Sequence, residues 1–253
     1  MNHTTQIRTQ LKRLKLSGIP DMLDLRVMEA QQNNLSYTEF LISVLLDEIE
    51  KRDMNKLKRL IDKARIGSGK TLETFDFSFN PLINTAYIKE LATCRFIEKG
   101  ENILFLGPTG TGKTHLTKAI CHMACRKYFS VRFFSAYEFF KELSRADMNG
   151  KFDKFTKELL SADLLVIDDF AFKKINQQSA EFLYSVVEQR YQIKSIIMTS
   201  NRAVSDWGAI FPDPVMANAI MDRLAHNAHH IIIKGESYRK KMNPQFKSLD
   251  FKT

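Results

Sequence analysis

Residues 107–114 carry a glycine-rich pattern whose chemistry is the binding of phosphate groups. They read Gly-Pro-Thr-Gly-Thr-Gly-Lys-Thr, which matches G-x-x-x-x-G-K-[ST]. Glycines let such a loop curl until successive backbone N–H groups face the oxygens of the β- and γ-phosphates of a nucleotide. Lys113 adds a positive charge on the phosphates, and Thr114 offers its hydroxyl to Mg²⁺. We therefore expect eight residues to bind the phosphates of ATP: Gly107, Pro108, Thr109, Gly110, Thr111, Gly112, Lys113 and Thr114.

A second, weaker match to this pattern occurs at residues 64–71, Ala-Arg-Ile-Gly-Ser-Gly-Lys-Thr. The surrounding sequence argues against a phosphate loop there, because a charged segment precedes it and no apolar helical face follows it. The first match has both neighbours that a phosphate loop needs: an apolar run at 102–106 and a helical pattern at 115–127. We predict that only the first match is a phosphate loop.

Two carboxylates stand at the end of a later apolar run. Residues 164–167 are apolar, and Asp168 and Asp169 follow them directly. We expect this strand to lie next to the phosphate loop and to bring both carboxylates to the magnesium and phosphate site. Asp168 would order Mg²⁺ through its water shell, and Asp169 would polarise the attacking water as a general base. The alternative for Asp169 is that it only caps the next turn.

Short apolar runs alternate with amphipathic segments from about residue 100 onward, which is typical of a parallel sheet with crossover helices. The expected strands are residues 102–106, 131–135, 164–168, 195–199 and 229–233. The expected helices are residues 115–127, 137–145, 152–160, 179–191 and one that begins at Asp213-Pro214. The fold class is therefore α/β.

The first 65 or so residues differ from the rest, since their apolar positions recur at spacings of three and four and predict helices. Gly67-Ser68-Gly69 then indicates a hinge. We predict a helical domain over residues 1–66 that binds DNA or a partner, a linker over 67–75 and an ATPase domain over 76–253.

The chain of 253 residues carries a formal net charge of +9, and this charge is unevenly placed. Residues 76–222 hold 18 basic and 17 acidic side chains, so the middle of the chain is nearly neutral. Basic side chains gather instead in two N-terminal blocks, where they could bind the phosphates of DNA. The alternative is that they form solvated helix faces. The candidate DNA contacts are Arg8, Lys12, Arg13, Lys15, Lys51, Arg52, Lys56, Lys58, Arg59, Lys63 and Arg65.

Composition excludes several other classes of protein. Apolar residues make up 44% and charged residues 26%, which is typical of globular proteins and not of disordered or fibrous ones. No stretch approaches the roughly 18 apolar residues of a membrane-spanning helix, and the N-terminus lacks the apolar block of a secretory signal. Three cysteines fit a reducing compartment. We expect a cytoplasmic protein without a membrane partner.

Several longer stretches resemble one family across nearly the whole chain. These are LKLSGIPDML, LLVIDDF, TSNRAVSDWGAIFPDPVMANAIMDRL and KGESYR. On these stretches the chain resembles the IstB family of insertion-sequence transposition helper ATPases, which belong with the DnaC-type helicase loaders in the AAA+ class. The resemblance implies an AAA+ P-loop NTPase with a parallel sheet flanked by helices, a small all-helical N-terminal domain and a reduced C-terminal lid.

The resemblance also implies roles for three further residues. Asn201 looks like the sensor-1 residue, which holds the attacking water near the γ-phosphate. Arg223 looks like the arginine finger that reaches the site of a neighbouring subunit, with a surface salt bridge as the alternative. Arg239 looks like sensor 2, which contacts phosphate within its own subunit, with a place in the basic tail as the alternative. The Phe-rich segment 75–79 resembles the family's segment before the ATPase core, and either borders the adenine pocket or only docks the linker.

Two departures from the wider class affect these expectations. Many AAA+ proteins have Asp-Glu at the acidic strand end, whereas Asp169 is one methylene shorter, so slow turnover is expected. Only about 20 residues follow the last expected strand, which places sensor 2 on a short terminal helix.

The function that the resemblance implies is an ATP-dependent, DNA-binding transposition helper in the cytoplasm, associated with the bacterial nucleoid. It would assemble on duplex DNA as a homo-oligomeric ring or spiral, hydrolyse ATP with Mg²⁺ between subunits, be stimulated by DNA, and direct a cognate transposase. Two alternatives remain: a DnaC-like replicative helicase loader, and a nucleotide-gated DNA-binding scaffold with negligible turnover.

Overall fold

The computed structural model describes residues 3–242, and the chain divides into two compact units whose border falls between Arg59 and Leu60. This border lies within a helix and before the Gly67-Ser68-Gly69 hinge, so the domain bounds 1–66, 67–75 and 76–253 stay a prediction. No helix within residues 3–242 is long and apolar enough to cross a membrane.

The N-terminal unit is helical, as the sequence predicts. It contains α1 (His3–Arg13), α2 (Ile19–Gln32) and the first part of α3 (Tyr37–Ala64). Its apolar core is small and is formed by Ile19, Leu23 and Val44 with Leu11, Leu16 and Phe40 against them. Buried carboxylates strengthen the packing of α2 on α3. Arg26 donates to both oxygens of Asp47 at 2.9 and 2.7 Å, and the Gly18 N–H donates to Glu48 at 2.6 Å.

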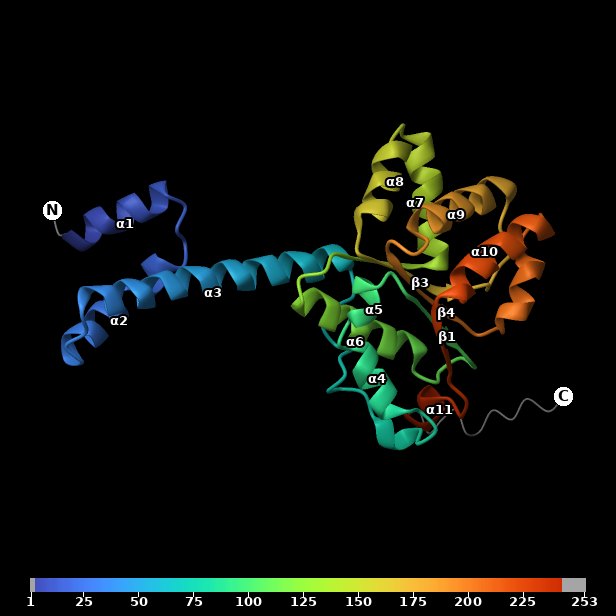
Figure 1. The fold of residues 1–253 in the computed structure, drawn as a ribbon, viewed down its shortest axis with the longest axis horizontal. Coiled ribbons are helices and arrows are strands. Elements are labelled where there is room, and N and C mark those ends of the chain that lie inside the picture. The colour runs from blue at the N-terminus through green and yellow to red at the C-terminus, as the bar shows by residue number, and fades with distance from the viewer. Residues whose placement is uncertain (1–2, 243–253) are drawn as a thin grey trace. The chain divides into compact units, whose positions relative to one another are not determined.

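The second unit is built on a five-stranded sheet whose paired strands all run parallel, in the order β2-β3-β4-β1-β5 (Figure 1). The strands are β1 (Asn102–Leu106), β2 (Val131–Ser135), β3 (Leu164–Phe170), β4 (Ser195–Ser200) and β5 (Ala228–Ile232). All five expected strands are present, although β3 continues two residues beyond its expected end. The α/β fold with a parallel sheet and flanking helices is confirmed.

Helices cover both faces of this sheet, with α6 on one side and α7, α8, α9 and α10 on the other (Figure 1). The larger core lies under the second group, where Phe139, Leu159 and Leu183 pack on Leu165 and Met198 of the sheet. The helices are η1 (Phe77–Phe79), α4 (Thr85–Leu91), α5 (Arg95–Glu98), α6 (Lys113–Arg126), α7 (Ala136–Met148), α8 (Phe152–Ser161), α9 (Gln177–Arg190), η2 (Val204–Ile210), α10 (Pro214–His226) and α11 (Tyr238–Met242).

The strand order determines how the acidic strand approaches the phosphate loop. The acidic strand β3 does not neighbour the phosphate-loop strand β1, because β4 lies between them. The reason is topological: the crossover from β1 to β2 skips two positions in the sheet, which β3 and β4 then fill. Since all strands are parallel, their carboxyl ends still share one edge, and that edge positions the site.

Candidate functional site

The phosphate loop joins the end of β1 to the start of α6. Gly112 caps this helix with a left-handed φ of +99°, and the helix begins at Lys113. The loop is anchored to the sheet because the Gly107 N–H donates to the carbonyl of Ser200 at 3.1 Å. The N–H groups of the first turn of α6 therefore point toward the loop, where they favour an anion.

Two glycines of the loop are required by their surroundings. A Cβ at Gly110 would lie 2.0 Å from the Ser237 hydroxyl, and one at Gly112 would lie 2.7 Å from the Phe75 ring. Both also have positive φ, which side-chain-bearing residues rarely adopt. The loop is therefore packed tightly against the segments before α4 and before α11.

Lys113 is buried inside the loop. Its ammonium donates to the carbonyls of Gly107 and Pro108, each at 2.7 Å. Burial lowers the pKa of Lys113 below its ordinary value, and the charges of Asp169 and Asp168 oppose this shift. A cation in this position offsets part of the charge of a phosphate held by the same loop.

Asp168 and Thr114 meet at the sheet edge, as the sequence predicts for two magnesium ligands. The Thr114 hydroxyl donates to Asp168 Oδ1 at 3.1 Å, and the Thr199 hydroxyl donates to the same oxygen at 2.5 Å. Burial raises the pKa of Asp168 above its ordinary value, while the hydrogen bond from Thr199 opposes the shift and the charge of Asp169 adds to it. Hydroxyl and carboxylate oxygens are the donors that Mg²⁺ prefers, so this pair fits that ion.

Asp168 and Asp169 lie at a bulge in β3. Ile167 pairs with Met198 and Phe170 with Ser200, so Asp168 and Asp169 together face one residue, Thr199. Asp169 has a left-handed φ of +55°, a conformation that aspartate tolerates better than most residues. Its backbone N–H donates to the Thr199 hydroxyl at 2.9 Å. One carboxylate is therefore buried and the other is exposed toward the phosphate loop.

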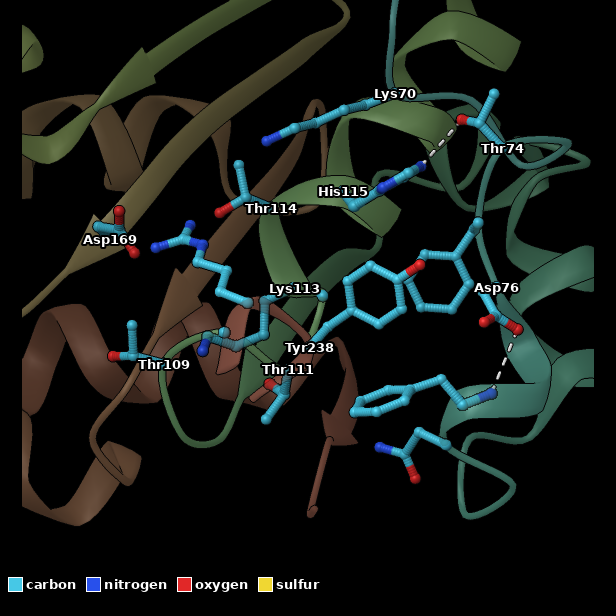
Figure 2. Close-up of a pocket in the computed structure, with 16 residues that line it drawn as sticks. Lys70, Thr74, Asp76, Thr109, Thr111, Lys113, Thr114, His115, Asp169 and Tyr238 are labelled. Carbon is cyan, nitrogen blue, oxygen red and sulfur yellow. Dashed lines mark hydrogen bonds between the residues drawn. The ribbon is translucent and has the colours of Figure 1, made fainter. Parts of the chain in front are cut away.

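Most of these groups line a cavity of about 260 Å³ (Figure 2). Its polar side has the phosphate loop, Asp169 and Arg239 of α11. Its other side is aromatic, with Phe75, Phe79 and Tyr238, and the rings of Phe79 and Tyr238 meet edge to face at 4.9 Å. Phosphate-binding groups beside an aromatic wall suit a nucleotide, whose base is apolar on its faces. The Phe-rich segment thus borders this cavity.

Two of the residues predicted by resemblance lie outside the cavity lining. Asn201 directly follows β4 and is exposed at the sheet edge where β1 also ends. Arg223 lies on α10 and packs on α9. It donates to the Ala219 carbonyl at 3.1 Å, lies 3.6 Å from Glu188, and stacks over the Tyr184 ring at 5.2 Å. The salt bridge that was the alternative for Arg223 is therefore present, and its role at a neighbouring site stays a prediction.

Sequence reasoning missed several residues that shape this site. Thr199 is a polar residue near the end of the apolar run of β4, and its hydroxyl was the available signal. Lys70 lines the cavity although it belongs to the rejected second match, and His115 lines it from the first turn of α6. No pattern in the sequence around His115 indicated that its side chain would line this cavity.

Comparisons with known proteins agree with this geometry. The family model described as IstB-like ATP binding protein matches residues 9–245. The ATP-binding protein assigned to insertion sequence IS5376 of Geobacillus stearothermophilus is 37% identical over 234 residues, covering 92% of this chain and 93% of that one. Its counterpart in insertion sequence IS21 of Pseudomonas aeruginosa is 35% identical, covering 93% and 89%.

Solved structures show the same fold at lower identity. The DnaC helicase loader superposes with a TM-score of 0.53 at 23% identity, covering 65% of this chain and 97% of that one. DnaA of Aquifex aeolicus with bound AMPPCP superposes with a TM-score of 0.56 at 22% identity, covering 74% and 57%. These likenesses show that the second unit shares the fold of DnaC and DnaA, in agreement with the AAA+ fold expected from the sequence.

Proposed function

Because this chain belongs to the family of IstB-like ATP-binding proteins, we propose that it is an ATP-dependent transposition helper of an insertion sequence. It assembles as a homo-oligomer on duplex DNA, hydrolyses ATP between neighbouring subunits, and directs and stimulates a partner transposase. The observation that carries the proposal is the cavity in which the phosphate loop, Asp169 and Arg239 meet. The insertion-sequence origin of the relatives supports the role in transposition.

The loop residues bind ATP with their backbone N–H groups, and Lys113 and Arg239 place positive charge on the phosphates. Thr114 and Asp168 hold Mg²⁺, which when bound neutralises charge that develops on the β- and γ-phosphate oxygens. Phe75, Phe79 and Tyr238 exclude water from the opposite side of the cavity. Each of these groups acts within one subunit.

Hydrolysis needs a base and a positioned water. Asp169 accepts the proton of the attacking water, because it is the exposed carboxylate of the pair and lines the cavity. Asn201, at the end of the adjacent strand, orients that water. Arg223 of a neighbouring subunit completes the site by stabilising the charge of the transition state. The shorter reach of aspartate compared with glutamate leads us to expect slow turnover that DNA stimulates.

Thr199 binds the Asp168 carboxylate and the backbone N–H of Asp169, so its hydroxyl should matter for turnover. We expect Thr199→Val to lower kcat roughly tenfold, because Asp168 and the Asp169 N–H each lose a hydrogen-bond partner worth about 1–2 kcal/mol. Thr199→Ser keeps the hydroxyl and should retain most of the activity. Phosphate release at saturating ATP and at varied Mg²⁺ measures the effect. A valine variant with unchanged kcat and Mg²⁺ dependence would show that Thr199 has no positioning role.

The basic N-terminal blocks are proposed to contact DNA phosphates. Lys12, Arg13 and Lys15 are exposed, whereas Arg8 lies 2.7 Å from Asp24. Arg52 and Lys51 are likewise paired, with Glu48 at 2.7 Å and Asp21 at 3.4 Å. The pairs of Arg8 and Lys51 are exposed and worth little, so DNA phosphates can compete for these two side chains, whereas the partner of Arg52 is buried. The exposed stretch around Lys12 is the sharper place to test.

The function is tested by measuring binding to duplex DNA across salt concentrations with a non-hydrolysable ATP analogue. We expect the log of the affinity to fall linearly with the log of the salt concentration. Replacing Lys12, Arg13 and Lys15 together with alanine should weaken binding. It should also make the fall of log affinity with log salt less steep, by about 0.9 for each DNA phosphate that the protein no longer neutralises. The matched control replaces Lys151, Lys154 and Lys157, three exposed lysines around α8. Equal losses for both triple variants, or no salt dependence, would contradict the DNA interface.

The partner can be identified separately from DNA binding. A pull-down with the intact protein and the ATP analogue should capture a transposase whose reading frame neighbours this one. Capture of a replicative helicase without a transposase would favour the helicase-loader alternative.

A further inference from the structure

The segment that follows α3 carries a lysine into the cavity. We call residues 65–76 the connector segment. It begins with left-handed backbone at Arg65 (φ +56°) and Gly67 (φ +68°), which turns the chain after the helix ends at Ala64. Lys70 lies in the middle of the segment, is partly buried and lines the same cavity as the phosphate loop.

The connector segment is held against the phosphate-binding helix. His115, in the first turn of α6, has its Nε2 2.9 Å from the Thr71 carbonyl and 3.2 Å from the Thr74 hydroxyl. The Phe75 ring meets the His115 ring edge to face at 5.1 Å. These contacts hold the residues that directly follow Lys70 against the first turn of α6.

The Lys70 side chain points toward the end of the cavity where the phosphate loop lies. Figure 2 shows its side chain extending toward the part of the site where Thr114 and Asp169 lie. None of the ion pairs found among residues 3–242 includes Lys70. Burial lowers the pKa of Lys70 below its ordinary value, as do the charges of Lys118 and Arg239, while Asp168 and Asp169 oppose the shift.

The charges around the cavity favour an anion with several negative groups. Three cations line it, Lys70, Lys113 and Arg239, against two carboxylates. One of these carboxylates, Asp76, already accepts the N–H groups of Ser78 and Phe79 at the start of η1. Cations that line one cavity repel one another, and a bound polyphosphate places negative charge between them.

We propose that Lys70 binds the terminal phosphate of ATP from within the same subunit, opposite the phosphate loop. This inference rests on the proposed binding of ATP in the cavity. It gives the connector segment a direct contact with the one phosphate that distinguishes ATP from ADP. In this proposal the match at residues 64–71 is not a phosphate loop itself. Its Lys70 instead contacts the phosphates that residues 107–114 bind.

The proposal is tested by measuring affinities for ATPγS and ADP with the full chain. Lys70→Ala should weaken ATPγS binding about tenfold or more, the usual effect of losing a hydrogen bond to a charged group, and leave ADP binding unchanged. Lys70→Arg should restore most of the affinity for ATPγS. Lys89→Ala, an exposed lysine on α4, is the matched control. Unchanged ATPγS binding by Lys70→Ala, or an equal loss for both nucleotides, would overturn the proposal.

A second measurement uses the unmodified protein and so does not depend on how a variant folds. Acetylation of lysines, read by mass spectrometry, should show Lys70 protected by ATPγS but not by ADP. Equal labelling of Lys70 with both nucleotides would also overturn the proposal. Lys113→Ala separates this from the proposed function: if that variant bound ATPγS like the unmodified protein, ATP binding in the cavity itself would be wrong.

Discussion

Asp169→Asn is expected to bind ATP and to assemble as the unmodified protein does, but to hydrolyse ATP roughly a hundredfold more slowly or worse. Removal of a general base usually costs a factor of this size or larger. The exchange keeps the shape of the side chain and removes only its ability to take a proton. Asparagine also tolerates the left-handed φ of +55° at this position, so the bulge in β3 should survive.

The measurement is phosphate release at saturating ATP, together with the affinity for ATPγS. Asp168→Asn should behave differently, because Asp168 is the buried carboxylate bonded to Thr114 and its loss should weaken binding that depends on Mg²⁺. Asp153→Asn, at an exposed aspartate on α8, controls for the loss of charge. Unchanged hydrolysis by Asp169→Asn would remove Asp169 from the role of base.

The sequence predicted the strands because their signals are local. Residues 102–106 and 131–135 are apolar runs that correspond to β1 and β2 residue for residue. Strand order has no local signal in the sequence, because each crossover determines which positions in the sheet stay open for later strands. For that reason the sequence did not show that β4 separates β3 from β1, although the shared carboxyl edge brings Asp168 to Thr114 as expected.

Contacts between distant segments account for what the sequence did not predict. The bulge at Asp168 and Asp169 is a feature of the pairing between β3 and β4, and no pattern within residues 164–169 encodes it. Lys70 reaches the cavity because His115 holds Thr71 and Thr74, a contact across more than forty residues of sequence. The charged segment before residues 64–71 and the lack of an apolar helical face after them are local features, and they could not place the lysine.

Arg223→Ala is expected to abolish nearly all hydrolysis, since an arginine finger contributes about a thousandfold or more to turnover. ATPγS binding should be little changed, because Arg223 does not line the cavity of its own subunit. Arg145→Ala removes an exposed arginine that pairs with Glu142 at 3.1 Å on α7, and it is the matched control. Hydrolysis at the unmodified rate by Arg223→Ala would show that this residue is only the surface salt bridge to Glu188.

Mixing two inactive variants decides whether Arg223 acts on a neighbouring subunit. Arg223→Ala keeps an intact phosphate loop, and Lys113→Ala keeps an intact Arg223. In an oligomer with head-to-tail interfaces, about a quarter of the interfaces in an equal mixture join an intact loop to an intact arginine. Hydrolysis should therefore return in the mixture to a measurable fraction of the unmodified rate. If Arg223 instead served only to hold α10 on α9 through Tyr184 and Glu188, each altered subunit would keep its own defect and mixing would restore nothing.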